Sequence, residues 1–210
     1  MPDLEETYRK ARRHLARRDP VLRRLVAAVG HCTLAPDRAD PFGLLVRSII
    51  SQQISGHAAR AIGERLRKAL GRRGVKPAAI LAASDELLRG AGLSANKIRS
   101  LRDLAGKVHA ALVPLHDLHK LEDEEVIDSL VPVRGIGRWT AQMFLIFSLG
   151  RLDVLPVDDL GLRSGVQRQY ELDELPKRKE IEELAEPWRP YRSIATWYFW
   201  RSFGAVPQSR

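Results

Sequence analysis

The stretch Val131-Pro132-Val133-Arg134-Gly135-Ile136-Gly137-Arg138-Trp139-Thr140 lies between two predicted helices and decides how the middle of the chain folds. The segment before it, Glu122 to Leu130, is acidic at its start and carries apolar residues at helical spacing. The segment Trp139 to Leu149 is largely apolar and has no Gly inside it and no Pro. Gly135 and Gly137 permit backbone angles closed to other residues and let an outside group approach closely. A helix N-terminus that follows glycines is an anion-binding site, so the stretch predicts a phosphate-binding hairpin, although a tight turn between packed helices would use the same glycines.

Two adjacent carboxylates follow further along the chain, in Pro156-Val157-Asp158-Asp159. They precede the predicted helix Leu160 to Tyr170, and either aspartate is a good helix cap. Two carboxylates are more than one cap requires. One of them is therefore a candidate for chemistry, with capping as the alternative for each.

The other segments also have helical patterns, most of them bounded by Pro, Gly, Asp or Ser. The further predicted helices are Leu4 to Arg18, Pro20 to Val29, Pro41 to Ser55, His57 to Leu70, Pro77 to Ala83, Asp85 to Gly90, Ala95 to Leu112, Lys179 to Ala185 and Tyr191 to Phe203. The nearest approach to a strand is Asp153 to Val157, which is short and ends at Asp158. The predicted fold class is all-α.

The chain of 210 residues carries a formal charge of +9, from 35 Lys and Arg against 26 Asp and Glu. Its basic residues recur in Arg9 to Arg24, Arg60 to Arg73 and Arg99 to Lys107, which is typical of helices with charged faces rather than of one basic tail. Such a surface favours a polyanionic partner, but charge alone does not identify that partner as nucleic acid. Hydrophobic residues make up 44% of the chain and can supply a substantial core.

Several kinds of site are excluded by the residue types. The single cysteine, Cys32, cannot form an internal disulfide or a four-cysteine iron–sulfur cluster. His116 and His119 have no cysteines nearby and are predicted to be loop residues rather than metal ligands. No stretch approaches the ~20 apolar residues of a membrane span, and the N-terminus is charged where a signal peptide would be apolar. A soluble cytoplasmic protein without a membrane association is expected.

Five motifs in a fixed order carry a family resemblance. They are Ile50-Ser51-Gln52-Gln53-Ile54-Ser55, Gly92 to Lys97, Arg134 to Ala141, Leu155 to Leu160, and Arg189 to Ser193. In this combination the chain resembles the helix-hairpin-helix (HhH-GPD) DNA glycosylases, most closely the 3-methyladenine DNA glycosylase II (AlkA-like) branch. The resemblance implies a two-lobed helical fold with the active-site cleft between the lobes. One lobe would be a central bundle of residues 42–150, and the two chain ends, residues 1–41 and 151–210, would form the other.

The activity that the resemblance implies is removal of alkylated purines, such as 3-methyladenine and 7-methylguanine, from double-stranded DNA. The enzyme would flip the base out of the duplex and leave an abasic site. In the family the second Asp of the pair faces the flipped nucleotide, so Asp159 is the expected catalytic residue and Asp158 the expected structural partner. Relatives that also cut the strand have a lysine at the position of Trp139, and a monofunctional enzyme is therefore expected.

The resemblance implies further roles around this centre. Gln53 corresponds to the residue that enters the duplex where the flipped base has left, although by sequence alone Gln52 and Gln53 would be polar positions on a helix. The base pocket would be formed by Trp139, Phe42, Tyr191 and Trp197, which are also reasonable core residues. The phosphate-binding hairpin would comprise Gly135, Gly137, Arg138 and Thr140.

No cofactor is expected to be required. In relatives the hairpin holds a sodium or potassium ion through backbone carbonyls that correspond to Val131, Val133 and Ile136. Arg134 stands where many relatives have proline, so a somewhat less rigid hairpin is expected. A monomer is expected.

Two alternative functions remain open at the level of sequence. The first is a glycosylase of the same fold that acts on deaminated or oxidised bases. The second is a non-enzymatic hairpin protein that only binds DNA. Asp159 and the aromatic residues argue against the second alternative, because phosphate binding requires neither.

Overall fold

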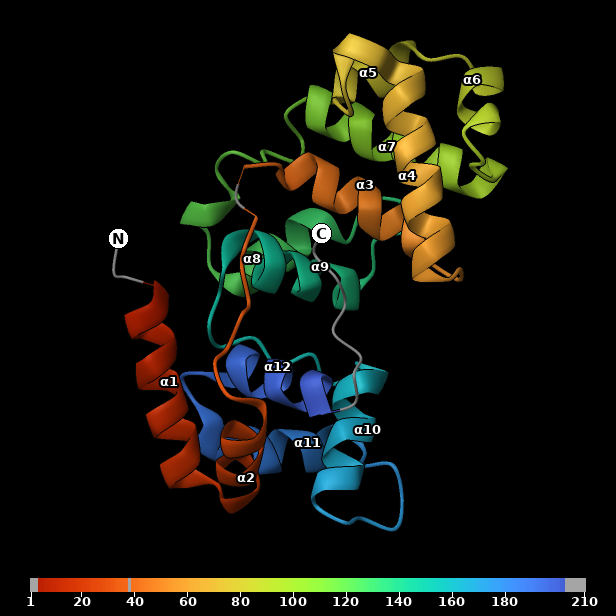
Figure 1. The fold of residues 1–210 in the computed structure, drawn as a ribbon. Coiled ribbons are helices and arrows are strands. Elements are labelled where there is room, and N and C mark those ends of the chain that lie inside the picture. Colours follow the sequence, from red (N-terminus) through yellow and green to blue (C-terminus); the bar gives the residue numbers. More distant parts are fainter. Residues whose placement is uncertain (1–3, 38, 203–210) are drawn as a thin grey trace. The chain divides into compact units, whose positions relative to one another are not determined.

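The computed structural model describes residues 4–37 and 39–202, and the regular structure within those residues is entirely helical (Figure 1). The all-α prediction is confirmed. The chain divides into two compact units. The hairpin unit is Asp37–Phe144, and the terminal unit combines Met1–Pro36 with Leu145–Arg210. The sequence placed the central unit at residues 42–150, and in the structure both of its boundaries lie earlier, at Asp37 and Phe144. The second boundary is where α9 (Arg138–Phe144) passes into the π-helical segment η3 (Leu145–Leu149).

The hairpin unit is organised around α7, which packs against α3, α5 and α6. α3 also contacts α4 and α9, and α8 contacts α9. The apolar faces of α3 and α7 supply fully buried residues such as Leu45, Ile49, Leu101 and Leu104. The elements of the unit are α3 (Pro41–Ser51), α4 (Gly56–Leu70), η1 (Gly71–Arg73), α5 (Pro77–Ala82), α6 (Asp85–Gly90), α7 (Ala95–His109), η2 (Leu118–Lys120), α8 (Asp123–Leu130) and α9 (Arg138–Phe144).

Short polar side chains begin several of these helices. Asp40 accepts a hydrogen bond from the Gly43 amide at 2.8 Å at the start of α3. Ser55, Ser84 and Ser94 cap α4, α6 and α7 in the same way, each through its hydroxyl oxygen. These caps explain why the predicted starts of the helices agree with the observed starts to within one residue.

α3 ends at Ser51, four positions before the predicted end at Ser55. The chain leaves the helix at Gln52, whose ψ is 129°, and Gln53 follows with a φ of 61° in the left-handed region. Ser55 then serves as the cap of α4 instead of continuing α3. The sequence prediction was wrong here because no Gly or Pro marks the turn.

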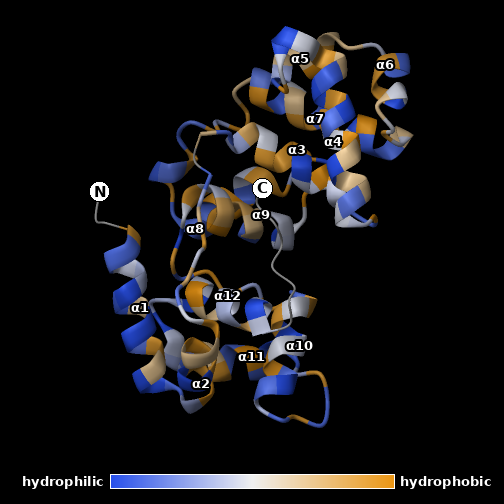
Figure 2. Cartoon of the chain, viewed as in Figure 1, coloured by the Kyte–Doolittle hydropathy of each residue, from blue (hydrophilic) through white to orange (hydrophobic). Residues whose placement is uncertain are grey.

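The terminal unit is built on α12, which contacts α1, α2 and α10. Every residue from Ser193 to Trp200 is buried, whereas α1 is largely hydrophilic (Figure 2). The elements of this unit are α1 (Leu4–Arg18), α2 (Pro20–Val29), η3, α10 (Leu160–Gln169), α11 (Arg178–Ala185), η4 (Glu186–Trp188) and α12 (Arg192–Ser202). Phe203, the predicted end of the last helix, lies outside the described residues. Among the described residues, no helix has the length and apolar character needed to cross a membrane.

A buried carboxylate, Asp19, joins the two chain ends within the terminal unit. Its Oδ1 atom accepts hydrogen bonds from the Val21 and Leu22 amides at 2.8 and 3.1 Å and so caps α2. Its Oδ2 atom accepts the hydroxyl of Tyr170 and the indole N–H of Trp188, the latter at 2.8 Å. Burial, together with the hydrogen bond to Asp19, raises the pKa of the Tyr170 hydroxyl. Asp19 therefore connects α2 to the end of α10 and to η4.

We expect the substitution Asp19→Ala to lower the free energy of unfolding by about 3–5 kcal/mol, because it leaves several buried donors without an acceptor. Tyr170→Phe is the matched control. It removes a single hydrogen bond and should cost about 1 kcal/mol. Urea denaturation of both variants measures the difference, and equal losses would show that Asp19 does not hold this network together.

Candidate functional site

The predicted phosphate-binding hairpin is the loop between α8 and α9. Val133 donates its amide to the Leu130 carbonyl and accepts the Ile136 amide, each at 3.0 Å. The side chains of Val133 and Ile136 are buried at 1% and 3% exposure. These two anchors fix the loop onto the hairpin unit and leave Gly135 and Gly137 on its surface.

The two glycines of the hairpin serve different purposes. Gly135 has φ +81°, and a Cβ atom there would lie 2.8 Å from the Ser100 hydroxyl oxygen. Gly137 has an ordinary backbone, and a Cβ atom there would meet nothing within 4 Å. Within the described residues, the amides of Gly135 and Gly137 donate no hydrogen bond to the protein. Gly135 is thus required by the shape of the loop, whereas Gly137 keeps the space in front of the amides open to an outside group.

Two side chains hold the hairpin backbone from outside the loop. Asp103 on α7 accepts the Arg134 amide at 2.7 Å, and Lys107 binds both oxygens of Asp103 at 2.5 and 2.6 Å. Burial raises the pKa of Asp103, but hydrogen bonds from the Arg134 amide and Lys107 outweigh burial and hold this pKa below its usual range. Gln52 donates its side-chain amide to the Gly135 carbonyl at 2.7 Å.

The remaining predicted hairpin residues have different surroundings. Arg138 forms a two-pronged ion pair with Glu124, with a 2.9 Å bond from Nη1, and this pair lowers the pKa of Glu124. Thr140 is buried at 4% exposure, whereas Trp139 next to it is 40% exposed. A phosphate that approached Arg138 would have to compete with the Glu124 carboxylate.

The carbonyls predicted to hold a sodium or potassium ion lie in the same loop. The Val133 carbonyl accepts the Ile136 amide, while the carbonyls of Val131 and Ile136 accept no hydrogen bond from the described residues. Neutral carbonyl oxygens suit a hard monovalent cation, so the donor set fits such an ion. The ion itself stays a prediction. Among the described residues, no cluster of three or more His, Cys, Asp or Glu could hold a metal.

The predicted wedge residue, Gln53, lies in the exposed turn between α3 and α4, which we call the wedge turn (residues 52–55). Its left-handed backbone is uncommon for a residue other than glycine. Lys97 of α7 donates to the Ile50 carbonyl at 2.5 Å, in the last turn of α3, immediately before the wedge turn. Gln53 is therefore presented on an exposed and strained turn rather than on a helix.

In the terminal unit, Asp159 begins α10 and is buried at 6% exposure. Its Oδ1 atom accepts the Leu162 amide at 2.6 Å and the indole N–H of Trp200 at 2.7 Å. Trp200 in turn stacks on Phe147, with ring centroids 5.7 Å apart. The carboxylate of Asp159 is therefore held in one orientation by two N–H donors.

Asp158 has the opposite environment. Its carboxylate is exposed and forms an ion pair with Arg178 of α11, whose Nε lies 2.5 Å from Oδ1. The sequence left open which aspartate caps the helix, and the structure assigns the cap to Asp159. The expected structural role of Asp158 is limited to this exposed ion pair, which stabilises the fold little.

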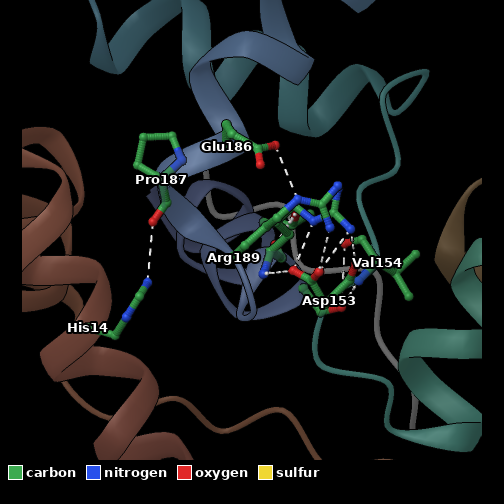
Figure 3. A network of polar contacts seen from close by, with 9 residues as sticks. His14, Asp153, Val154, Glu186, Pro187 and Arg189 are labelled. Atoms are coloured by element: carbon green, nitrogen blue, oxygen red, sulfur yellow. Dashed lines mark hydrogen bonds and ion pairs between the residues drawn. The ribbon is translucent and has the colours of Figure 1, made fainter.

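The segment that leads to Asp159 is fixed by the predicted motif Arg189 to Ser193 (Figure 3). Both oxygens of Asp153 accept hydrogen bonds from Arg189 and Arg192, at 2.8 to 2.9 Å from the two guanidinium groups. The Ser193 amide donates to the Leu152 carbonyl, and the Ser193 hydroxyl accepts the Val154 amide, both at 2.9 Å. The motif thus positions the chain just ahead of the catalytic candidate.

The other predicted pocket residues are mostly packed. Phe42 is 6% exposed in the hairpin unit, and Trp197 is 2% exposed in the terminal unit, with Tyr198 edge-on at 5.0 Å. Tyr191 is half-buried and contacts His14 edge-on at 5.4 Å. Core packing accounts for Phe42 and Trp197 in the described structure, so their place in a base pocket stays a prediction. Sequence reasoning missed the contact of Trp200 with Asp159, because no spacing rule joins residues so far apart.

The chain matches one protein family over most of its length. A model of the HhH-GPD superfamily of base excision DNA repair proteins matches residues 46–190. The chain is 36% identical over 198 residues to DNA-3-methyladenine glycosylase 1 of Schizosaccharomyces pombe, covering 92% of this chain and 86% of that protein. The range matched by the family model includes the wedge turn, the hairpin and Asp159.

Solved structures agree with the sequence relatives. A 3-methyladenine DNA glycosylase of Schizosaccharomyces pombe in complex with abasic DNA has a TM-score of 0.83 at 34% identity, covering 96% of this chain and 100% of that chain. DNA-3-methyladenine glycosidase from Bacillus halodurans has a TM-score of 0.82 at 35% identity, covering 97% and 90%.

The two hairpin glycines should respond differently to alanine. Gly137→Ala should keep the melting temperature of the parent protein and weaken binding to damaged and undamaged duplexes alike by about tenfold, because its methyl group blocks amides that contact phosphate. Gly135→Ala should lower the stability by about 1–2 kcal/mol, because alanine is strained at positive φ.

Thermal denaturation, with fluorescence anisotropy on both duplexes at one salt concentration, measures these effects. Parental affinity of Gly137→Ala for undamaged DNA would show that the hairpin amides do not contact a phosphate.

Proposed function

The chain belongs to the HhH-GPD superfamily of base excision DNA repair proteins, and we propose that it is a monofunctional DNA glycosylase for alkylated purines in duplex DNA. It hydrolyses the N-glycosidic bond and leaves an abasic site, acting as a monomer in the cytoplasm. The observation that carries the proposal is the buried carboxylate of Asp159, held at the start of α10 by two N–H donors. The names of the relatives at 34–36% identity support the same activity.

A single carboxylate suffices for this reaction. Cleavage of an N-glycosidic bond builds positive charge on the sugar, and an ionised aspartate nearby stabilises that charge and orients the attacking water. The Leu162 amide and the Trp200 indole hold Asp159 in place, so little reorganisation is needed when the charge develops.

The leaving group needs no dedicated acid when the base is alkylated. A purine such as 7-methylguanine or 3-methyladenine carries a positive charge and departs as a neutral base. Trp139 is 40% exposed and offers an indole face, which favours a cationic base by about 0.5–2 kcal/mol. We propose that Trp139 contributes this preference in the base pocket.

Strand cleavage by an imine requires an amine, and the residues at the proposed site offer none. Trp139 occupies the position where strand-cutting relatives have lysine, and an indole forms no Schiff base. A thiolate is the other strong nucleophile to consider. The one thiol of the chain, Cys32, is buried, and burial raises its pKa to about 12, so it stays protonated. Hydrolysis is therefore the proposed reaction.

Binding of the duplex is assigned to the hairpin unit. The amides of Gly135 and Gly137 would hold a backbone phosphate, and Gln53 would fill the gap left by the extruded base. A cation bound to the hairpin carbonyls would add positive charge beside that phosphate. A protein that only bound DNA would need the hairpin and not the buried Asp159.

A panel of defined duplexes tests the reaction and the range of lesions. We expect release of 3-methyladenine and 7-methylguanine to be faster than release of hypoxanthine or 8-oxoguanine, and product strands to stay intact until alkali is added. Base release is measured by chromatography, and strand cleavage by denaturing gels with and without alkali. Faster release of a neutral deaminated or oxidised base would favour the alternative glycosylase, and borohydride trapping in proportion to turnover would contradict the monofunctional assignment.

The substitution Asp159→Asn should lower excision of 3-methyladenine by about 10²–10³-fold with little loss of stability. Asparagine keeps one carbonyl oxygen, and both N–H donors bind a single oxygen of Asp159, so the cap survives while the charge is lost.

Asp158→Asn is the matched control, because it makes the same change in an exposed ion pair. It should leave the excision rate unchanged and cost at most about 1 kcal/mol of stability. Single-turnover kinetics and denaturation of both variants decide the assignment. Equal activity of the two variants would reject Asp159 as the catalytic residue.

A further inference from the structure

Two exposed turns of the hairpin unit are fixed to the same helix. Lys97, Ser100 and Asp103 lie on successive turns of α7. Lys97 binds the end of α3 before the wedge turn, and Asp103 binds the hairpin at the Arg134 amide. Between them, Ser100 lies so close to Gly135 that a Cβ atom there would be 2.8 Å from its hydroxyl oxygen. We call these three residues the α7 support.

Lys97 and Asp103 hold the two turns through backbone atoms. The Ile50 carbonyl and the Arg134 amide are each bound by a charged group that is partly buried, which gives shorter and stronger bonds than neutral pairs. Burial lowers the pKa of Lys97. Because the main chain is held at both places, the two turns cannot move independently of α7 without breaking these bonds.

A direct bond also joins the two turns. Gln52 belongs to the wedge turn, and its side-chain amide donates to the Gly135 carbonyl at 2.7 Å. Its chain neighbour Gln53 is the strained, exposed residue of that turn, and Gly135 is the glycine of the hairpin with a positive φ. The bond therefore joins Gly135 to the residue immediately before Gln53.

We propose that Gln52 is a positioning residue that couples the wedge turn to the phosphate-binding hairpin, while the α7 support holds both in place. The inference rests on the proposed function, in which Gln53 enters the duplex and the hairpin holds a phosphate. Once the hairpin has bound a backbone phosphate, the Gln52 bond sets where Gln53 meets the base stack. The binding energy of the phosphate thereby helps to stabilise the distorted duplex in which the target base is extruded.

The coupling has a specific consequence. Without the Gln52 bond, the hairpin still binds phosphate and Asp159 still hydrolyses an extruded nucleotide. Extrusion then depends on how readily the target base leaves the duplex unaided, and a paired base leaves less readily than an unpaired one. Loss of positioning should therefore make the excision rate depend more strongly on the base opposite the lesion. A general loss of folding would not produce that dependence.

The test uses Gln52→Met, which keeps the length of the side chain and removes the donor. Gln167→Met is the matched control, because Gln167 is also half-buried and donates its side-chain amide to a backbone carbonyl, that of Asp173, in the terminal unit. Excision of 7-methylguanine is measured opposite cytosine and opposite an abasic-site analogue. We expect Gln52→Met to slow excision about tenfold opposite cytosine and less than about twofold opposite the abasic site, with unchanged affinity for undamaged duplex. The control should match the parent protein on both substrates.

Equal losses on the two substrates would overturn the coupling and leave Gln52 with a structural role, as would parental rates on both. A second measurement does not depend on cleavage of the N-glycosidic bond. In an Asp159→Asn background, 2-aminopurine placed beside the lesion reports unstacking by a rise in fluorescence, and Gln52→Met should reduce that rise. If the parent protein releases no base from any duplex, the proposed function fails, while the fluorescence comparison still decides whether Gln52 couples the two turns.

Discussion

The amides left without partners at the start of every α-helix are the constraint on which this structure depends. Asp19, Asp40 and Asp159 satisfy such amides with carboxylates, and serines do so at α4, α6 and α7. The hairpin before α9 has Gly137 at the corresponding place, which offers no side chain to its amides. A phosphate is a chemically equivalent acceptor. In the proposed contact, a DNA phosphate would accept the amide hydrogen bonds that Asp and Ser side chains accept at the other helices.

The terminal unit uses one arrangement twice, a buried aspartate that caps a helix and also accepts an indole N–H. At Asp19 the partner is Trp188, and the cap and the indole lie on different oxygens. At Asp159 the partner is Trp200, and both donors lie on Oδ1. A capped and buried carboxylate is therefore no sign of catalysis by itself. Asp159 is distinguished by its place in Leu155 to Leu160, one of the five motifs that carry the family resemblance, within the range that the family model matches.

Local features of the structure were predictable from the sequence, and distant pairings were not. Asp19 followed by Pro20, and Ser94 followed by a helical pattern, mark helix starts that the structure confirms, because capping is decided by neighbouring residues. The contact of Trp200 with Asp159 and that of Gln52 with Gly135 join residues 41 and 83 positions apart. Such contacts follow from how helices pack, which no local pattern records. The wedge turn was missed for a related reason, since tertiary bonds from Lys97 and Gln52 hold it without a glycine.

Arg134 gives the hairpin a backbone N–H at the position where the family resemblance led us to expect proline. Proline would fix one backbone angle but has no N–H to donate. Arg134 has that N–H, and it binds Asp103 at 2.7 Å, which ties the loop to α7. Arg134 thus makes a backbone hydrogen bond that proline could not make, while the expected difference in rigidity stays a prediction. Because the folded pKa of Asp103 is depressed, the stability gained from this bond is fully present above the unfolded pKa of about 3.9 and is lost only as the pH falls through the lower folded value. The bond between Asp103 and the Arg134 amide therefore holds the hairpin to α7 at neutral pH.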